Sequence, residues 1–419
     1  VYNGGSLDAY DGHAALIAGE EVELYDDENE ESTRTQKRVR VSQNPGEATN
    51  TGSITAEQGI AGMYAGVVNQ EGLVTAVTAV YGNGTVELLA SKKITTGAGS
   101  TTGTPLSTSG DTVDSSWTTT DESVVTLGGL EVGEDETDNP DYIELYGKIV
   151  SPSGNVTITA EDRIYMASGS SIDVSGAWDE RSASDNQVEM NLNSVELSDD
   201  FLARIGSLLG ETIKVNALVG TCIGHIDGYL NKKSVSVYGL NTEGGSIVMK
   251  TTANDSDIII DEGASIRFAG GGINYSAGLV ETSKVRIGDT IYDIGSIPDE
   301  ILEMADEIEL VDNETAARYG ATYIDAYQEG DDAGGLTIVT DTLVLNGNLD
   351  GSVTRGTYQT LAAEPTATFG DITYQTASGL REPDAGELII GVSGDSKETI
   401  DRRINAVVFQ AGIAKLDQG

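Results

Sequence analysis

Short segments in which apolar and polar residues alternate recur along the chain, and each begins with a glycine. Ile, Val, Leu or Ala recur at alternate positions of these segments, with Thr, Ser, Glu or Asp frequent between them. A period of two is that of a β-strand with one buried face. The segments begin at Gly52, Gly72, Gly84, Gly154, Gly245 and Gly335. Because the first two lie about one solenoid coil apart, with no helical pattern between copies, we expect a parallel β-helix.

The alternation and its interruptions divide the chain into five parts. These are coils over 1–100 with a charged loop at 26–40, a Ser/Thr/Gly-rich and acidic loop insertion over 101–141, coils over 142–297, one short helical insertion over 298–320, and coils over 321–419. Ile301, Leu302 and Ala305 recur at helical spacing after Pro298, which predicts the helix. A second, ambiguous helix could begin at Ser198. With most of the chain wound at roughly 20 residues per coil, the rod would be on the order of 100 Å long.

Acidic residues dominate the charge of this chain of 419 residues. It holds 68 Asp and Glu against 24 Lys and Arg, a formal net charge of −44 at pH 7. Such a chain repels nucleic acids, heparin-like polyanions and anionic membrane surfaces, so none of these is expected as a partner. Its 38% of hydrophobic residues suffice for a folded core. The carboxylates suit the solvated surface of a secreted protein or, for some of them, the binding of Ca²⁺.

The two ends of the chain carry no recognisable signal or cap. No apolar run reaches the length of a membrane span, and no signal peptide precedes the first strand pattern. Repeat proteins need polar caps on their end coils, and neither end resembles one. We therefore expect the coils of 321–419 to continue in a longer parent chain.

Four segments resemble one particular family of repeat proteins. They are residues 83–100, 154–176, 193–200 and 266–278. Each is similar to the passenger repeats of filamentous-haemagglutinin-like large exoproteins, which bacteria export by two-partner secretion. The resemblance implies a right-handed β-helical passenger, carried across the outer membrane by a transporter and acting in adhesion or as an extracellular fibre. The secretion domain of that family is not in this chain, and the family supplies no active-site residues.

The enzyme alternative is a β-helical polysaccharide hydrolase or lyase. Such hydrolases need closely placed carboxylates with a nearby histidine. Asp199 and Asp200, followed by His225, faintly match the order seen in polygalacturonases, but the further motifs of that family are missing. We read both aspartates as caps of a turn or helix. Cys222 has apolar neighbours and is expected to be a small buried residue rather than a thiol activated by His225. No catalytic residue is assigned, and we expect no enzyme.

Several turns rich in oxygen-bearing or glycine residues are candidates for metal or nucleotide sites. Residues 346–351 match the first half of a Ca²⁺ loop, but Thr357 stands where a bidentate glutamate belongs, so we expect a β-turn. The pairs Asp255 with Asp257 and Asp331 with Asp332 suit solvated corners, and Gly270 to Gly272 suit a close-packed turn. No metal-binding or cofactor-binding residue is assigned; Ca²⁺ remains a possible ligand.

Tyrosine is the one abundant aromatic residue, with 17 Tyr against 4 Phe and 2 Trp. Its ring and hydroxyl suit sugar-stacking or subunit contacts, although the high strand propensity of tyrosine and its tolerance of half-burial explain its abundance better. Five Asn-x-Ser/Thr sequences begin at Asn83, Asn155, Asn254, Asn274 and Asn313. We predict a secreted, non-enzymatic structural or adhesive protein of a bacterial surface or matrix. Its expected partners are further copies in head-to-tail fibres and cell-surface or matrix carbohydrate or protein.

Overall fold

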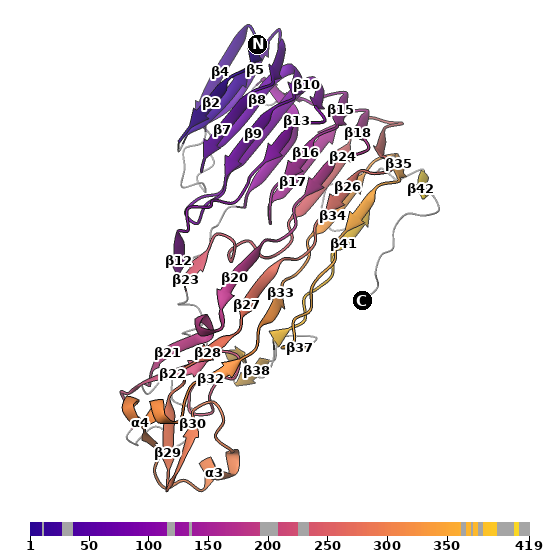
Figure 1. Ribbon diagram of the computed structural model, residues 1–419. Coiled ribbons are helices and arrows are strands. Elements are labelled where there is room, and N and C mark those ends of the chain that lie inside the picture. The colour runs from indigo at the N-terminus through magenta and orange to yellow at the C-terminus, as the bar shows by residue number, and fades with distance from the viewer. Residues whose placement is uncertain are drawn as a thin grey trace.

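The protein is an all-β molecule with a curled parallel sheet, so the predicted all-β fold class is confirmed. The computed structural model describes residues 1–10, 12–26, 37–114, 122–133, 136–192, 208–224, 234–361, 366–369, 372–375, 380–391 and 406–409. Within them the strands gather in a broad stack, from which a narrow arm extends (Figure 1). No helix of the described residues has the length and apolar character needed to cross a membrane.

The stack consists of three rows of parallel strands, in which the chain visits each row in turn. Row one holds β3 (His13–Ile17), the first halves of β8 (Ile60–Gln70) and β10 (Thr85–Thr96), β13 (Val124–Gly133), β17 (Asn155–Ala160), β24 (Ser246–Thr251), β34 (Gly335–Val339) and β41 (Glu387–Ile390). Row two holds β1 (Tyr2–Asn3), β6 (Glu47–Asn50), the second halves of β8 and β10, β15 (Tyr142–Leu145), β18 (Arg163–Met166), β25 (Asp257–Ile260), β35 (Thr342–Leu345) and β42 (Ala406–Phe409). Row three holds β2 (Ser6–Ala9), β7 (Ser53–Glu57), β9 (Leu73–Val77), β11 (Thr101–Gly103), β16 (Lys148–Val150), β19 (Ser171–Asp173), β26 (Ser265–Arg267) and β36 (Asn348–Asp350).

The stack is shorter than the sequence suggests. Row three is an eight-stranded sheet. At a strand spacing of about 4.8 Å it extends for about 34 Å, against the expected 100 Å. The reason is that the chain leaves the stack for two long excursions that build the arm, and for a third between β36 and β41, so far fewer residues than expected are wound as coils.

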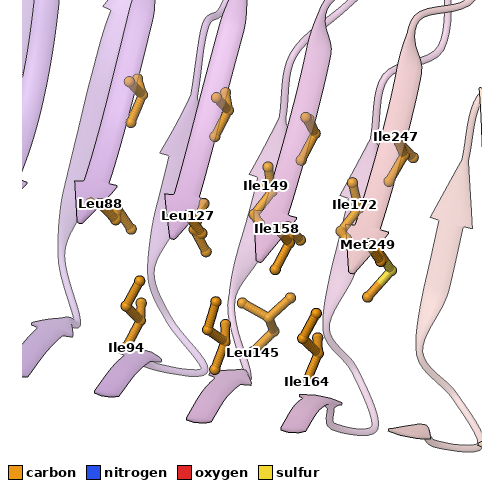
Figure 2. Packing of buried hydrophobic residues seen from close by; sticks show 14 of the residues in the cluster. Leu88, Ile94, Leu127, Leu145, Ile149, Ile158, Ile164, Ile172, Ile247 and Met249 are labelled. Atoms are coloured by element: carbon orange, nitrogen blue, oxygen red, sulfur yellow. The ribbon is translucent and has the colours of Figure 1, made fainter. Parts of the chain in front are cut away.

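Aliphatic side chains form continuous columns inside the stack. Leu88, Leu127, Ile158, Met249 and Ile338 occupy matching positions on consecutive strands of row one. All five are buried, and Figure 2 shows the first four pointing into the space between the rows. Parallel pairing in constant register keeps each inward position inward on the next strand. The alternating pattern of the sequence therefore builds a single apolar core, since the core residues of all three rows belong to one packed cluster.

Several glycines that open the repeated segments, together with Gly334 just before Gly335, lie at corners where adjacent backbones nearly touch. A Cβ added to Gly245 would lie 2.1 Å from the carbonyl oxygen of Gly154, and one added to Gly334 would lie 1.8 Å from that of Gly245. Gly72 stands over Gly52 in the same way at another corner, with a corresponding distance of 2.1 Å. No side chain fits at such distances. Glycine is therefore required here by the close approach of stacked coils.

Buried polar side chains also pair from strand to strand. The amide of Asn3 donates to the side-chain oxygen of Asn50 at 2.8 Å, and the amide of Asn50 donates to that of Gln70 at 2.8 Å. Gln70 in turn donates to the carbonyl of Thr101 at 3.2 Å. All three amides are buried and hydrogen-bonded, so burying them costs little free energy of folding. Their hydrogen bonds fix the register of the first coils.

The predicted charged loop at 26–40 is partly a hairpin, formed by β4 (Glu21–Asp26) and β5 (Lys37–Gln43); its tip lies outside the described residues. The hairpin does not simply project into solvent. Val39 and Val41 pack against Tyr64 and Leu130 on the outer surface of row one. The charged residues of β5 alternate with these valines, and this apolar face holds the hairpin on the stack.

A titratable cluster lies beneath this hairpin. The hydroxyl of Tyr64 lies 3.0 Å from Nε2 of His13 and donates a hydrogen bond to the carboxylate of Glu87. Burial raises the pKa of Glu87, and the opposing effects of the Tyr64 hydrogen bond and of Arg38 are smaller. Glu131 adds to the rise. Glu87 is thus held where its charged form is disfavoured.

Because of this cluster, we expect the free energy of unfolding to depend on pH through Glu87, and Glu87→Gln to reduce that dependence. A carboxyl whose pKa is higher in the folded chain favours folding while protonated, and the gain is lost as the pH rises through the raised pKa. We therefore expect stability to fall as the pH rises above the ordinary Glu value of 4.5. Glu87→Gln, which keeps an acceptor for Tyr64, should flatten this fall in urea unfolding between about pH 4 and about pH 8. The exposed control Glu136→Gln should leave the profile unchanged; equal profiles for Glu87→Gln and the unchanged protein would contradict this explanation.

The predicted loop insertion over 101–141 is wrong, because it contains strands of the stack. Thr101–Gly103 form β11, which pairs with strands on both sides in row three, and Val124–Gly133 form β13 in row one. Thr102 is fully buried in this stretch, so a hydroxyl-rich composition concealed a strand. Glu136–Asp138 form β14, which pairs antiparallel with β13.

The arm is built from the two excursions of the chain, residues 178–224 and 272–330. Its strands are β20 (Trp178–Ser182), β21 (Gln187–Asn191), β22 (Thr212–Asn216), β27 (Gly272–Ser276), β28 (Gly278–Val280), β29 (Lys284–Ile287), β30 (Thr290–Asp293), β31 (Glu309–Leu310), β32 (Thr322–Ile324) and β33 (Tyr327–Gly330). Coils were expected through 142–297, but here β21 pairs antiparallel with β22 and β29 with β30. The arm has apolar clusters of its own, distinct from the core of the stack.

The expected single helix of 298–320 is two short helices at the tip of the arm. They are α3 (Asp299–Glu303) and α4 (Asn313–Arg318), with β31 between them (Figure 1). Asp312 caps α4 by accepting a hydrogen bond from the Thr315 amide at 2.9 Å. The region near Ser198 lies outside the described residues. The remaining short elements are the 3₁₀ turn Ala183–Asn186 and the strands β12 (Thr112–Asp114), β23 (Ser234–Ser236), β37 (Gln359–Leu361), β38 (Thr366–Phe369), β39 (Ile372–Gln375) and β40 (Leu380–Arg381).

Candidate binding groove on the arm

The first sheet of the arm is a direct outward extension of row three. β20 follows β19, and β27 follows β26, so two strands that pair in the stack pair again in the arm, parallel in both places. β33 then returns antiparallel beside β27 and leads back to the stack. Consecutive coils thus carry the sheet together, which fixes its position relative to the stack (Figure 1).

A row of polar side chains crosses this sheet. Glu180, Asn274 and Gln328 occupy matching positions on its three strands. The amide of Asn274 donates to the Glu180 carboxylate at 2.6 Å, and the amide of Gln328 donates to the Asn274 side-chain oxygen at 2.7 Å. Glu180 and Gln328 are exposed and Asn274 is half-buried. The three groups are therefore held in order by one another, and keep hydrogen-bonding capacity for a ligand because each amide has a second N–H and the carboxylate a second oxygen.

Arg355, Gly356 and Thr357, from a later segment of the chain, form a wall beside this polar row. The wall and the polar row together line a groove with a volume of about 550 Å³. The wall is fixed to the sheet by Gln359, which is buried. Its side-chain oxygen accepts hydrogen bonds from the Gly330 and Gly356 amides at 2.9 and 2.7 Å, and its amide donates to the Gly330 carbonyl at 2.6 Å.

The arginine of the wall is also held in place. The Arg355 guanidinium forms an ion pair with Glu382 at 2.6 Å and donates from Nε to the Gln359 carbonyl at 2.9 Å. It is exposed, so the pair with Glu382 adds little stability. The Arg355 guanidinium instead offsets part of the negative charge of the carboxylates around the groove. Its remaining N–H groups are free to donate hydrogen bonds to a ligand.

Three tyrosines make the groove rigid. Tyr275 and Tyr327 are stacked with ring centres 4.5 Å apart, and Tyr358 meets Tyr327 edge-on at 5.0 Å. The Tyr327 hydroxyl accepts a hydrogen bond from the Asn186 amide. Burial raises the pKa of both Tyr275 and Tyr327 well above its ordinary value, so both hydroxyls stay protonated. Tyr358 is 41% exposed and presents an aromatic surface beside the wall.

A second cavity of about 560 Å³ lies at the tip of the arm. Ile287, Tyr292, Ile301 and Met304 supply its apolar part, and the Met304 side chain is 73% exposed. It is bordered by acidic residues, one of which, Glu309, pairs with Arg286 at 3.7 Å. This cavity has no polar row comparable to that of the groove.

The residues weighed for catalysis do not form a described site. Asp199, Asp200 and His225 lie outside the described residues. Cys222, expected to be buried, is exposed. The adjacent Ile223 is buried in the core of the arm, whereas Cys222, in a bend outside any strand, faces outward.

The carboxylates weighed for Ca²⁺ have protein partners. The β-turn expected over 346–351 is wrong, because Asn348–Asp350 form strand β36 of row three and pair in parallel with β26. Asp350 accepts from the Ser352 hydroxyl at 2.7 Å and lies 3.5 Å from Arg267. Asp257 forms an ion pair with Arg163 at 2.6 Å. Within the part of the chain that the structure describes, no three His, Cys, Asp or Glu side chains converge as a metal site. Binding of Ca²⁺ therefore stays a prediction.

The remaining acidic corner and the glycine turn meet each other. Asp331 accepts from the Thr242 hydroxyl at 2.6 Å, and Asp332 accepts from Arg381. A Cβ on Gly270 would lie 2.0 Å from the Asp331 carbonyl oxygen. The turn at Gly270 is thus closely packed, as its sequence suggests.

Comparisons with known proteins leave the chain without an assigned family: no protein-family model, curated protein or solved structure matches it. The similarity to filamentous-haemagglutinin-like exoproteins therefore stays a prediction.

The sequence did not predict the groove, because its polar row joins residues far apart in sequence. The sequence features that bear on the groove are the tyrosine content and Asn274, which stands out in the sequence only as the start of an Asn-x-Ser motif.

Proposed function

We propose that the three strand rows close into a right-handed parallel β-helix, and that the chain is a secreted, non-enzymatic structural or adhesive protein. The continuous apolar column through consecutive strands of row one carries the proposal. Such a core stacks coils into a stiff support, and strand pairing along its axis lets further copies add end to end as fibres. The arm, extended from two coils, is suited to contact a surface.

The location and the route of export belong to the same proposal. A bacterial cell surface or extracellular matrix suits a chain of net charge −44 that is soluble and repels polyanions. Passage through an outer-membrane transporter is what the similarity to two-partner exoproteins implies.

A turnover assay separates this function from that of a polysaccharide hydrolase or lyase. The purified chain, incubated with neutral and acidic polysaccharides, should generate no new reducing ends and no unsaturated products. Sedimentation of the same sample should show end-to-end association that grows with protein concentration. Turnover that disappears in Asp199→Asn or Asp200→Asn would make the protein an enzyme and overturn the proposal.

A further inference from the structure

We infer that the groove of the arm is a binding site for a neutral oligosaccharide. The inference rests on the adhesive function proposed above and names the ligand class of its contact site. Its basis is the juxtaposition of the ordered row Glu180–Asn274–Gln328 with the Arg355 wall and the exposed ring of Tyr358.

The hydrogen-bonding groups of the groove match those of a sugar. Each sugar hydroxyl both donates and accepts, so it is best satisfied by neighbouring groups of both kinds. The row offers carboxylate oxygen, amide N–H and amide oxygen in succession on adjacent strands, about 4.8 Å apart. Because these side chains are already tied to one another, a ligand does not have to order them on binding.

The charge of the groove selects for a neutral ligand. Glu180 lies in the polar row, and Glu329 and Glu382 stand near it. The two nearby cations are Arg355 and Arg181, and Arg181 is paired with Asp179 at 2.7 Å. Arg355 is already neutralised by Glu382 at 2.6 Å. An acidic sugar would meet uncompensated carboxylates within the field of a chain of net charge −44.

Size and lining favour a short saccharide over an apolar peptide. A volume of about 550 Å³ falls in the range of small-molecule sites, which is about 300–1,000 Å³. Apart from the tyrosines, the lining side chains that reach the groove are polar or small. Tyr358 is not a lining residue, but it follows the lining residue Thr357 and meets the lining residue Tyr327 edge-on. Its exposed ring therefore borders the groove, where the C–H face of a sugar can stack on it.

The test is calorimetric titration of the full chain with chitotriose, cellotriose, maltotriose and trigalacturonate. We expect one or more of the neutral trisaccharides to bind and trigalacturonate not to bind. Asn274→Ala and Gln328→Ala should each weaken that binding at least about tenfold, since each loses direct hydrogen bonds and disorders its neighbour. Tyr358→Ala should weaken it as well.

Asn69→Ala is the matched control. Asn69 is also a half-buried amide paired with a glutamate on the adjacent strand, at 2.7 Å from Glu47, but it lies on the stack. It should bind as the unchanged protein does. Circular dichroism of each variant shows that the strands remain.

Three results would overturn the inference: no neutral trisaccharide binding, binding that survives both groove substitutions in folded variants, or a preference for trigalacturonate. None of these by itself removes the proposed structural function, which is tested by turnover and sedimentation. Conversely, turnover of a polysaccharide abolished in Asp199→Asn would overturn the structural function whatever the groove binds.

Discussion

Replacing Gly245 by alanine should destabilise the protein by about 3 kcal/mol. The added methyl group would lie 2.1 Å from the carbonyl oxygen of Gly154 on the preceding coil. That oxygen accepts the backbone hydrogen bond of Ser246 at 3.1 Å, so it cannot retreat without breaking the pairing of two coils. Both colliding groups belong to backbone, and rotation of a side chain cannot relieve the contact. Urea unfolding followed by circular dichroism measures the loss as a lower midpoint.

Gly99→Ala is the matched control for this prediction. Gly99 also lies in the stack, is exposed, and has no neighbouring atom within 4 Å of an added Cβ. Its substitution should change stability by no more than about 0.5 kcal/mol. Equal midpoints for the two variants would show that the coils are not stacked as closely at Gly245 as described.

A larger loss, of about 4 kcal/mol, is expected for Ile158→Ala. Ile158 is fully buried at the centre of the aliphatic column, between Leu127 and Met249 on the adjacent strands. Removing its side-chain carbons forfeits their burial and leaves a cavity. The neighbouring strands pair in fixed register on both sides and cannot collapse to fill it.

The control for the core is the adjacent outward residue. Thr157 lies on the same strand and points to the other face. Thr157→Ala should cost less than about 0.5 kcal/mol in the same urea unfolding measurement. A small loss for Ile158→Ala, comparable with that of Thr157→Ala, would mean that row one has no continuous core.

The stacked strands could be predicted because their cause is local. Alternation in segments such as the one around Ile158, and the glycine that opens each segment, follow directly from one buried face and close-packed corners. The same signals could not tell coils from the arm. Trp178–Ser182 and Gly272–Ser276 pair in parallel and in constant register as coil strands do, although they lie outside the stack.

The groove could not be predicted from local sequence. Gln328 reaches Asn274 only because β33 returns antiparallel beside β27, and Gln359 then fixes the wall to Gly330. Nothing in the sequence near these residues records that return. Cys222 shows a related limit, since its apolar neighbours predicted burial, but it lies exposed in a bend in which only the adjacent Ile223 enters the core of the arm.

Cryo-electron microscopy of the purified chain tests the central claim most directly. We expect particles in which three faces of parallel strands enclose one core, with coils about 4.8 Å apart along the stack axis and an arm extending from two of them. Particles joined end to end along that axis would agree with the proposed fibre. A compact particle of antiparallel sheets, or an open sheet without a third face, would contradict the account.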